Sequence, residues 1–163
     1  MTTLVNQQGP RTQFLSFVLG GEEYAVNILR VKEIIEYDSL TRVPAMPPCV
    51  RGVINLRGRV VPVVDLAARF GLAGSSITRR SCIVMVELTD GDESVVVGII
   101  TDAVSQVLDL AESAIEPPPS FGASIDTAFI LGLAEAEKKF VIVLDVDRCL
   151  NAADLFGDEA LVA

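Results

Sequence analysis

The chain has 163 residues, of which half are hydrophobic and 21% are charged, a composition typical of a packed globular domain and not of a disordered chain. Its 13 basic and 22 acidic residues give a formal net charge of −9, which repels phosphate backbones and argues against a nucleic-acid partner. No histidine is present, so the commonest general base and the commonest metal ligand are both missing, and we expect neither a metal nor a cofactor.

Short runs rich in valine and isoleucine, separated by glycine, proline or charged clusters, predict a mainly β protein. In chain order, the expected strands cover residues 13–19, 22–27, 33–38, 52–57, 59–65, 81–88, 94–101, 105–109, 130–135 and 139–145. Tight turns are expected at 20–21, 57–58, 90–92 and 135–138. Helical segments are few: one turn at 27–31, capped by Asn27, and short helices that begin after Asp65 and after Asp145.

Acidic residues such as Glu87, Asp90 and Asp102 interrupt the most hydrophobic region, so no apolar run reaches the roughly 18–20 residues that cross a bilayer. The opening MTTLVNQQGPRTQ lacks the basic start and apolar core of a signal peptide. Cys49, Cys82 and Cys149 have neither metal-ligand nor disulfide spacing and are interpreted as buried thiols in a reducing compartment. We therefore expect a cytoplasmic protein without direct membrane insertion.

The two halves of the chain repeat the same spacings. VKEIIEYDSLTRVP (31–44) aligns with VSQVLDLAESAIEP (104–117), and GVINLRGRVVPVVD (52–65) aligns with GLAEAEKKFVIVLD (132–145). Chance similarity among valine-rich strands is the alternative, but four matched intervals in the same order favour duplication. Five short strands per copy favour a closed barrel, which removes exposed edges. The prediction is two similar five-stranded β-barrels packed side by side, with a few short helices.

The expected domain organisation is a single domain over 13–151 between a polar N-terminal tail (1–12) and a C-terminal tail (152–163). One barrel is expected to use roughly residues 13–75 with the C-terminal segment, and the other residues 80–145. The polar stretch GLAGSSITRR (71–80) is the expected crossing between them.

Three segments resemble the CheW family of chemotaxis coupling proteins: FLSFVLGGEEYAVNILRVKEII (14–35), RVPAMPPCVRGVINLRGRVVPVVDL (42–66) and VGIITDAVSQVLDL (97–110). The string GVINLRGRVVPVVDL is the most specific of them, and the resemblance covers about residues 12–151. It implies two five-stranded barrels around a hydrophobic junction, no enzymatic activity and a scaffold role in signalling arrays. The implied partners are the regulatory domain of the histidine kinase CheA and the cytoplasmic tips of chemoreceptors (methyl-accepting chemotaxis proteins), with other CheW copies as a further candidate.

The family also includes the regulatory domain of CheA and the amino-terminal domain of CheV, which occur attached to other domains. A kinase needs a nucleotide-binding domain and a phospho-accepting histidine, and CheV needs a receiver domain, so we expect a stand-alone adaptor. Two alternatives stay open: a CheW-like scaffold in a non-flagellar pathway, and a small-molecule-binding β-barrel protein. A shortage of aromatic and polar anchors argues against the second, since the chain has no tryptophan and two tyrosines.

Arg57, in a turn between two apolar strands, is the first candidate partner-binding residue, together with Asn55 and Gly58 of the same NLRG string. An isolated turn arginine is ordinarily a solvated side chain. The resemblance implies a contact role for this position, where the guanidinium would pair with a partner carboxylate or carbonyl.

Two further groups are partner-binding candidates through the resemblance. Val31, Glu33 and Ile34 form the first, and period-two geometry places Val31 and Glu33 on one face of an extended segment, where a half-buried strand with a solvated acid is the plainer interpretation. Gly98, Val104 and Val107 form the second, where core valines and a glycine at a close strand approach are the plainer interpretation. A receptor helix docking at the junction would need an apolar groove lined by Val104 and Val107.

Asp65 and Asp145 each follow an apolar strand and precede a short helical run, and a pair of catalytic carboxylates is one interpretation of them. Helix capping explains both without any chemistry and is preferred. No catalytic residue is predicted, because the sequence lacks a nucleophile with a base, a metal cluster and a phosphate-binding glycine loop.

Overall fold

The computed structural model describes residues 10–70, 77–90, 93–117 and 129–150. Its strands are β1 (Arg11–Leu19), β2 (Glu22–Asn27), β3 (Val31–Glu36), β4 (Val50–Leu56), β5 (Arg59–Asp65), β6 (Cys82–Asp90), β7 (Glu93–Thr101), β8 (Ala103–Ala111), β9 (Ile130–Ala136) and β10 (Lys139–Leu144). Every predicted strand is present, with each boundary within two residues of its expected place. Because β1 starts at Arg11, the tail expected over 1–12 overlaps this strand; residues 1–9 and 151–163 lie outside the described ranges.

The helices are single turns at the predicted places. They are η1 (Ile28–Arg30), α1 (Leu66–Arg69) and α2 (Val146–Cys149), with an additional turn, η2 (Glu112–Ala114), that the sequence did not predict. Asn27 caps η1 as expected, because its Oδ1 accepts a hydrogen bond from the Leu29 amide at 2.8 Å. None of the helices in the described part of the chain is long and apolar enough to cross a membrane.

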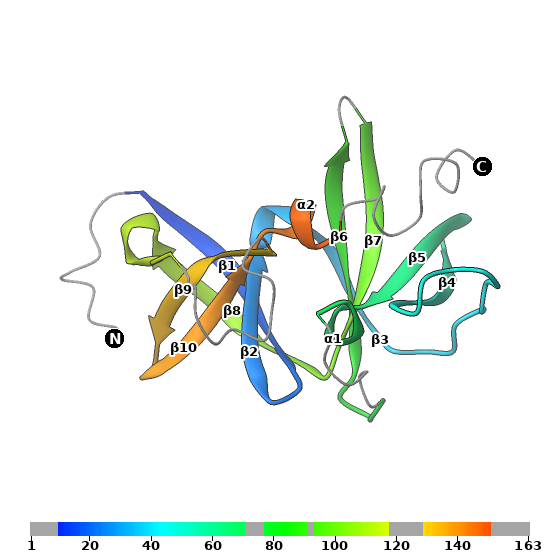
Figure 1. Cartoon of the computed structure of the whole chain (residues 1–163), viewed down its shortest axis with the longest axis horizontal. Helices are drawn as coiled ribbons and strands as arrows, with labels where there is room; N and C mark the ends of the chain where they lie inside the picture. The colour runs from blue at the N-terminus through cyan, green and yellow to red at the C-terminus, as the bar shows by residue number, and fades with distance from the viewer. Residues whose placement is uncertain (1–9, 71–76, 91–92, 118–128, 151–163) are drawn as a thin grey trace.

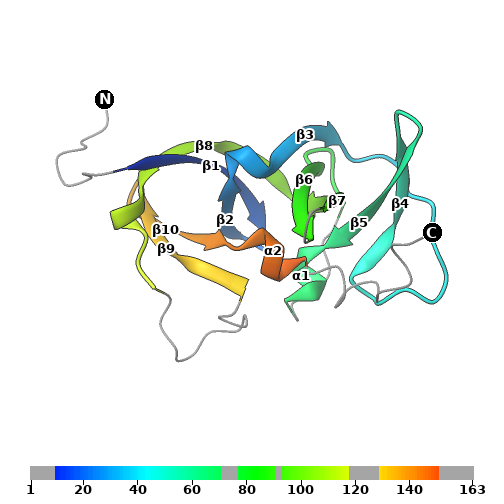
Figure 2. The same ribbon diagram turned by 90° about the horizontal axis from the view of Figure 1, so that it is seen from above.

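The strands form two five-stranded sheets that lie side by side, with α1 and α2 between them (Figures 1 and 2). The first, here called barrel A, has the order β8-β1-β2-β10-β9, and the second, barrel B, has the order β3-β6-β7-β5-β4. Each contains one parallel pairing, β2 with β10 and β7 with β5, at the same place in the order. The predicted fold class is therefore confirmed.

A pair of backbone hydrogen bonds closes each sheet. The segment after β3 returns to the far edge, where Thr41 and Val53 exchange amide-to-carbonyl bonds of 3.0 and 2.8 Å. In barrel A, Glu116 and Leu133 exchange two bonds of 2.8 Å. Both closures depend on a glycine, because a Cβ on Gly52 would lie 2.5 Å from the Thr41 carbonyl oxygen and one on Gly132 would lie 2.4 Å from that of Glu116.

The expected division of the chain between the barrels is wrong. Barrel B is one continuous stretch, β3 to β7, whereas barrel A joins β1 and β2 to β8, β9 and β10. The chain therefore crosses between barrels at η1 and again between β7 and β8, and not within 71–80. Residues 13–75 do not make one barrel because the β1–β2 hairpin pairs with strands from the second half of the chain.

The internal repeat predicted from spacing is present in the strand registers. In β3 the pairing skips Lys32, and in β8 it skips Ser105, which aligns with Lys32. In β4 it skips Arg51, and in β9 it skips Leu131, which aligns with Arg51. Strand pairing alone does not require irregularities at matching places, so these shared bulges support duplication over chance.

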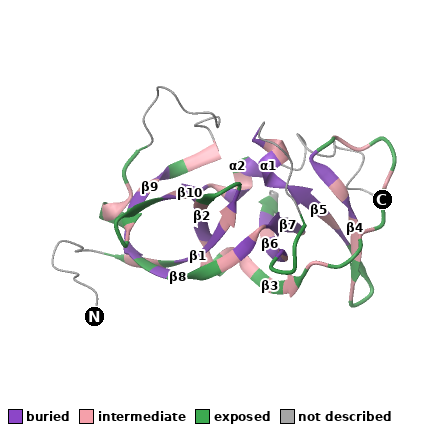
Figure 3. Cartoon of the chain, turned by 90° about the horizontal axis from the view of Figure 1, so that it is seen from below, coloured by how far each residue is buried: buried purple, intermediate pink, exposed green. Residues whose placement is uncertain are grey.

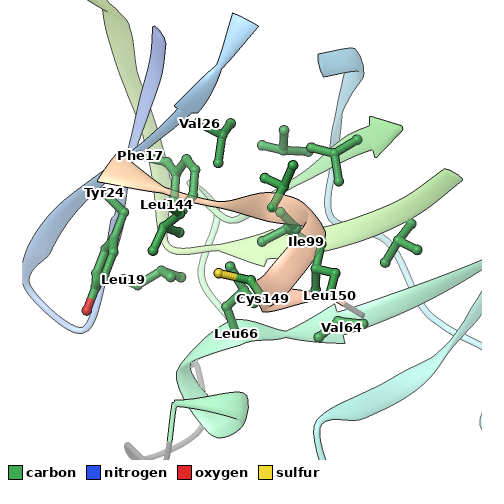
Figure 4. Close-up of a cluster of buried hydrophobic side chains, with 14 of the residues drawn as sticks. Phe17, Leu19, Tyr24, Val26, Val64, Leu66, Ile99, Leu144, Cys149 and Leu150 are labelled. Atoms are coloured by element: carbon green, nitrogen blue, oxygen red, sulfur yellow. The ribbon is translucent and has the colours of Figure 1, made fainter. Parts of the chain in front are cut away.

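The hydrophobic core has three parts. Phe14, Ala25, Leu108, Leu110, Ala134, Val141 and Val143 fill barrel A, and Val61, Val63, Ile83, Met85 and Ile100 fill barrel B. The largest part, here called the main core, lies between the barrels and takes side chains from both. Figure 4 shows Phe17, Tyr24 and Leu144 of barrel A in one cluster with Val64 and Ile99 of barrel B and Leu66 of α1, with Cys149 and Leu150 of the α2 region among them. A shared core of this extent makes the barrels one folding unit.

Candidate functional site

Arg57 and Gly58 form a two-residue turn between β4 and β5. Their φ angles are 52° and 84°, the left-handed pair that a type I′ hairpin turn requires. Asn55 supports the turn, because its Oδ1 accepts a hydrogen bond from the Gly58 amide at 2.8 Å. Asn55 and Gly58 therefore shape the turn, and Arg57 is the residue that the turn presents.

The turn places Arg57 against β3 of the same barrel. Its Nη1 and Nη2 donate to the two carboxylate oxygens of Glu33 at 2.9 and 3.0 Å, a bidentate ion pair. The Arg57 side chain remains 73% exposed, and these bonds use two of its five N–H donors. The pair joins two candidate residues that are 24 positions apart in sequence and leaves donors facing solvent.

The predicted grouping of Val31 with Glu33 on one face is wrong because of the bulge at Lys32. Val31 lies opposite Val86 and Ile34 lies opposite Val84, and both partners belong to the main core. Glu33 lies opposite Met85, whose side chain fills barrel B. Val31 and Ile34 therefore share one face of β3, and Glu33 lies on the other.

Val104 and Val107 hold the matching positions on β8 of barrel A. They lie opposite Phe17 and Leu15, which both belong to the main core. On each strand the first valine packs partly against the main core, whereas the outer residue is open to solvent: Ile34 is 42% exposed and Val107 is 49% exposed. Figure 3 shows the exposed stretches of β3 and β8 beside the buried strands. Four candidates thus form two equivalent apolar pairs that extend from the main core to the surface.

Barrel A repeats the Arg57–Glu33 contact with different chemistry. In the internal alignment Arg57 corresponds to Glu137 and Glu33 to Gln106, and the Gln106 Nε2 donates to the Glu137 carboxylate at 2.9 Å. Glu137 and Lys138 form the turn with φ angles of 51° and 67° and no glycine, a conformation that costs non-glycine residues energy. The two barrels therefore present the same geometry, with a guanidinium outward on one and a carboxylate on the other.

Gly98 was predicted as a partner-binding residue, but it lies inside the fold. It is buried in β7, and a Cβ there would lie 2.7 Å from the Ile83 Cγ2 and 3.3 Å from the Met85 sulfur. In barrel A, Ala25 is the residue that occupies the matching register position beside the parallel strand. Close approach of strands explains the glycine, as the plainer interpretation proposed.

Several exposed apolar side chains were not among the predicted site residues. The most exposed of them are Leu29 (82%), Val60 (71%), Phe140 (66%) and Leu131 (53%). Val60 and Phe140 align with each other in the internal repeat, at the second position after each hairpin turn. The internal repeat could have revealed this exposed apolar pair. Strand alternation predicts a polar residue at a solvent-facing position, and here both copies have an apolar one.

Asp65 and Asp145 act as helix caps, which confirms the interpretation preferred from the sequence. Asp65 accepts hydrogen bonds from the amides of Ala67 and Ala68, and Asp145 accepts one from the amide of Arg148. The side chain of Asp65 is fully buried, and its second oxygen is paired with Arg51 at 3.2 Å. Both carboxylates are thus engaged in structure.

Two of the cysteines, Cys49 and Cys149, are buried and are poor nucleophiles in this fold. Burial, with a smaller contribution from the Asp145 carboxylate, raises the pKa of Cys149 to about 12, and burial raises the pKa of Cys49 as well. Cys82 is partly exposed, which corrects the expectation that all three thiols are buried. Among the described residues, no three histidine, cysteine, aspartate or glutamate side chains are grouped in a way that could hold a metal ion.

Comparison with known proteins agrees with this architecture. The CheW-like domain model matches residues 13–154. A chemotaxis protein CheW of Klebsiella aerogenes is 38% identical over 88% of this chain and 84% of its own length, and one of Bacillus subtilis is 34% identical over 85% and 86%. The crystal structure of the scaffolding protein TtCheW from Thermoanaerobacter tengcongensis superposes with a TM-score of 0.81 at 33% identity and covers 96% of both chains. The chain therefore belongs to the CheW family, whose members are chemotaxis adaptor and scaffold proteins.

Proposed function

We propose that this protein is a cytoplasmic, non-catalytic adaptor that couples chemoreceptor tips to the regulatory domain of the histidine kinase CheA. Membership of the family supports an adaptor role in chemotaxis. The observation that carries the finer proposal is the exposed Arg57 guanidinium, which Glu33 holds in place and which keeps donors free for a partner carboxylate or carbonyl.

Holding Arg57 in advance lowers the cost of binding. A free arginine side chain loses rotamer freedom when it joins an interface, whereas a side chain already fixed by two hydrogen bonds has less freedom to lose. We assign the kinase contact to the surface formed by Arg57, Asn55, Gly58 and Glu33. The ion pair itself is worth little to folding, because Arg57 is largely exposed to solvent.

The receptor contact is assigned to the two apolar pairs, Val31 with Ile34 and Val104 with Val107. A helical receptor tip needs an apolar stripe on its partner, and these pairs extend the main core to the surface on both barrels. One molecule would then hold a receptor and a kinase together and raise the local concentration of each near the other. Other copies of the chain are a further proposed partner in such an array.

Replacing Arg57 with alanine is expected to weaken binding to the regulatory domain of CheA from the same organism about tenfold, a typical cost of removing a central charged contact. Calorimetric titration of the purified proteins measures this change in affinity. Glu137→Ala is the matched control, because it removes the equivalent turn contact from barrel A only. Equal affinity of Arg57→Ala and wild type would move the kinase contact elsewhere. A folded wild type that binds no CheA of its host would leave a CheW-like scaffold of another pathway as the better proposal.

Val107→Asp is expected to lower binding to a receptor cytoplasmic fragment at least tenfold while the affinity for CheA stays within twofold, since a buried unpaired carboxylate at an interface is costly. Co-sedimentation with receptor fragments measures the first affinity. Leu131→Asp is the control, because Leu131 is similarly exposed on β9, away from both apolar pairs. Loss of receptor binding in both variants would contradict the assignment to the β3 and β8 faces.

A further inference from the structure

Neither half of the chain contains a complete barrel. Among the described residues of 10–70 and of 77–150, strands of the same half pair only as the local hairpins β1–β2, β4–β5, β6–β7 and β9–β10, apart from the two closing bridges. The remaining pairings, β1–β8, β2–β10, β3–β6 and β5–β7, all join one half to the other. Each barrel is thus an interface between halves.

These half-to-half pairings carry most of the fold. The main core mixes side chains from both halves, such as Phe17 and Val64 from the first and Val84 and Ile99 from the second. The α1 and α2 turns also meet across the halves, where the Arg69 Nε donates to the Cys149 carbonyl at 3.1 Å. The covalent chain between α1 and β6, residues 70–81, is the single connection between the halves.

We propose that a second copy of this chain can supply the missing half, so that two chains form a dimer by exchanging halves. In that dimer the first half of one chain pairs with the second half of the other, and every strand pairing, bulge and closing bridge of the monomer is kept. The two forms then differ in which chain supplies each half and in the entropy of association. Each two-barrel unit in the dimer carries one complete Arg57–Glu33 surface, so the dimer presents two.

Concentration decides between the two forms. Two halves joined by a short tether see each other at an effective concentration on the order of 1 mM. Exchange therefore competes with the monomer when the protein concentration approaches about 1 mM during refolding. Once formed, the dimer reverts slowly, because reversion requires all four half-to-half pairings to open.

A disulfide reporter across the halves tests the proposal. Glu36 of β3 lies directly opposite Cys82 of β6, and the Tyr37 amide donates to the Ser81 carbonyl one residue beyond each. This makes 36 and 82 a non-hydrogen-bonded pair, the closer kind in an antiparallel ladder and the one suited to a disulfide. Both positions are accessible to solvent. The full-length Glu36→Cys variant, oxidised after refolding, records whether β3 and β6 come from one chain or two.

We expect the disulfide to stay within one chain after refolding at about 10 µM, and about half of it to join two chains after refolding at about 1 mM. Non-reducing electrophoresis separates the two products. The control carries Thr89→Cys and Ser94→Cys with Cys82→Ser, because residues 89 and 94 pair inside the β6–β7 hairpin and stay in one chain in either form. Equal amounts of covalent dimer in reporter and control would mean random cross-linking and would overturn the proposal.

Light scattering on the wild-type protein provides a reading that does not depend on the disulfide. After refolding at about 1 mM, we expect a dimer peak that persists on dilution. A wild-type sample that elutes as monomer alone after this treatment would overturn half exchange, whatever the reporter variant shows.

Discussion

Replacing Gly132 with alanine is expected to lower the free energy of unfolding by about 2–3 kcal/mol, the upper range for an overpacked site. The new Cβ would lie 2.4 Å from the Glu116 carbonyl oxygen and 2.7 Å from the Ile115 Cγ2. The backbone oxygen cannot move without breaking the two bonds that close barrel A. Thermal unfolding should show the loss as a melting temperature lower by about 5–10 °C.

The other glycines separate steric from conformational effects. Gly52→Ala should cost a similar amount in barrel B, where the Thr41 oxygen lies 2.5 Å from the new Cβ. Gly20→Ala meets nothing within 4 Å and carries only the cost of its φ of 58°, about 1 kcal/mol. If Gly132→Ala were no more harmful than Gly20→Ala, the closing bridge would not contribute to stability as proposed.

Asp65→Ala is expected to cost about 3–4 kcal/mol, because it removes a buried carboxylate that pairs with Arg51 and caps α1. Asp145→Ala provides an internal comparison. Asp145 caps α2 in the same way but is partly exposed, and Leu131 occupies the position that matches Arg51. Asp145→Ala should therefore lower the free energy of unfolding by about 1 kcal/mol, the value of a helix cap alone. Urea unfolding of both variants measures the difference.

A double-mutant cycle identifies the source of the Asp65 effect. Arg51→Leu copies the barrel A residue and leaves Asp65 as a buried charge without this guanidinium, so we expect a loss of about 3 kcal/mol. Combining it with Asp65→Asn, which keeps an oxygen for the cap, should recover most of that loss. Losses that simply add would show that Asp65 and Arg51 act independently, contrary to the expected coupling.

The positions of the strands could be predicted from the sequence because they depend on local patterns. The barrel that each strand joins could not be predicted in this way. Hairpins such as β1–β2 and β6–β7 are set by short turns between apolar runs. The partner of a hairpin is set by contacts far along the chain, and the two halves offer the β1–β2 hairpin similar partners. Ala25 of β2 and Gly98 of β7 occupy matching places beside parallel strands, so residue pattern alone did not distinguish the barrels.

The site was predictable residue by residue but not in its arrangement. The exposed Arg57 follows from the NLRG turn, whereas its pairing with Glu33 needs the barrel to close. The face of Glu33 was assigned wrongly because a bulge at Lys32 leaves no mark in an alternating pattern. Gly98 was a partner-contact candidate only through the family resemblance, whereas the interpretation from the residue itself, a close approach of strands, agrees with its buried position.

The interleaved order of the strands also sets the sequence of events during synthesis on the ribosome. Barrel B is encoded without interruption from Val31 to Thr101 and can close as soon as β7 has emerged. The β1–β2 hairpin emerges before barrel B but has no sheet to join until β8 to β10 follow, so Phe14, Leu15 and Phe17 stay uncovered until those strands are made. Of the ten strands, the two made earliest are thus among the last to be protected, and a stalled nascent chain would expose an apolar hairpin beside a finished barrel.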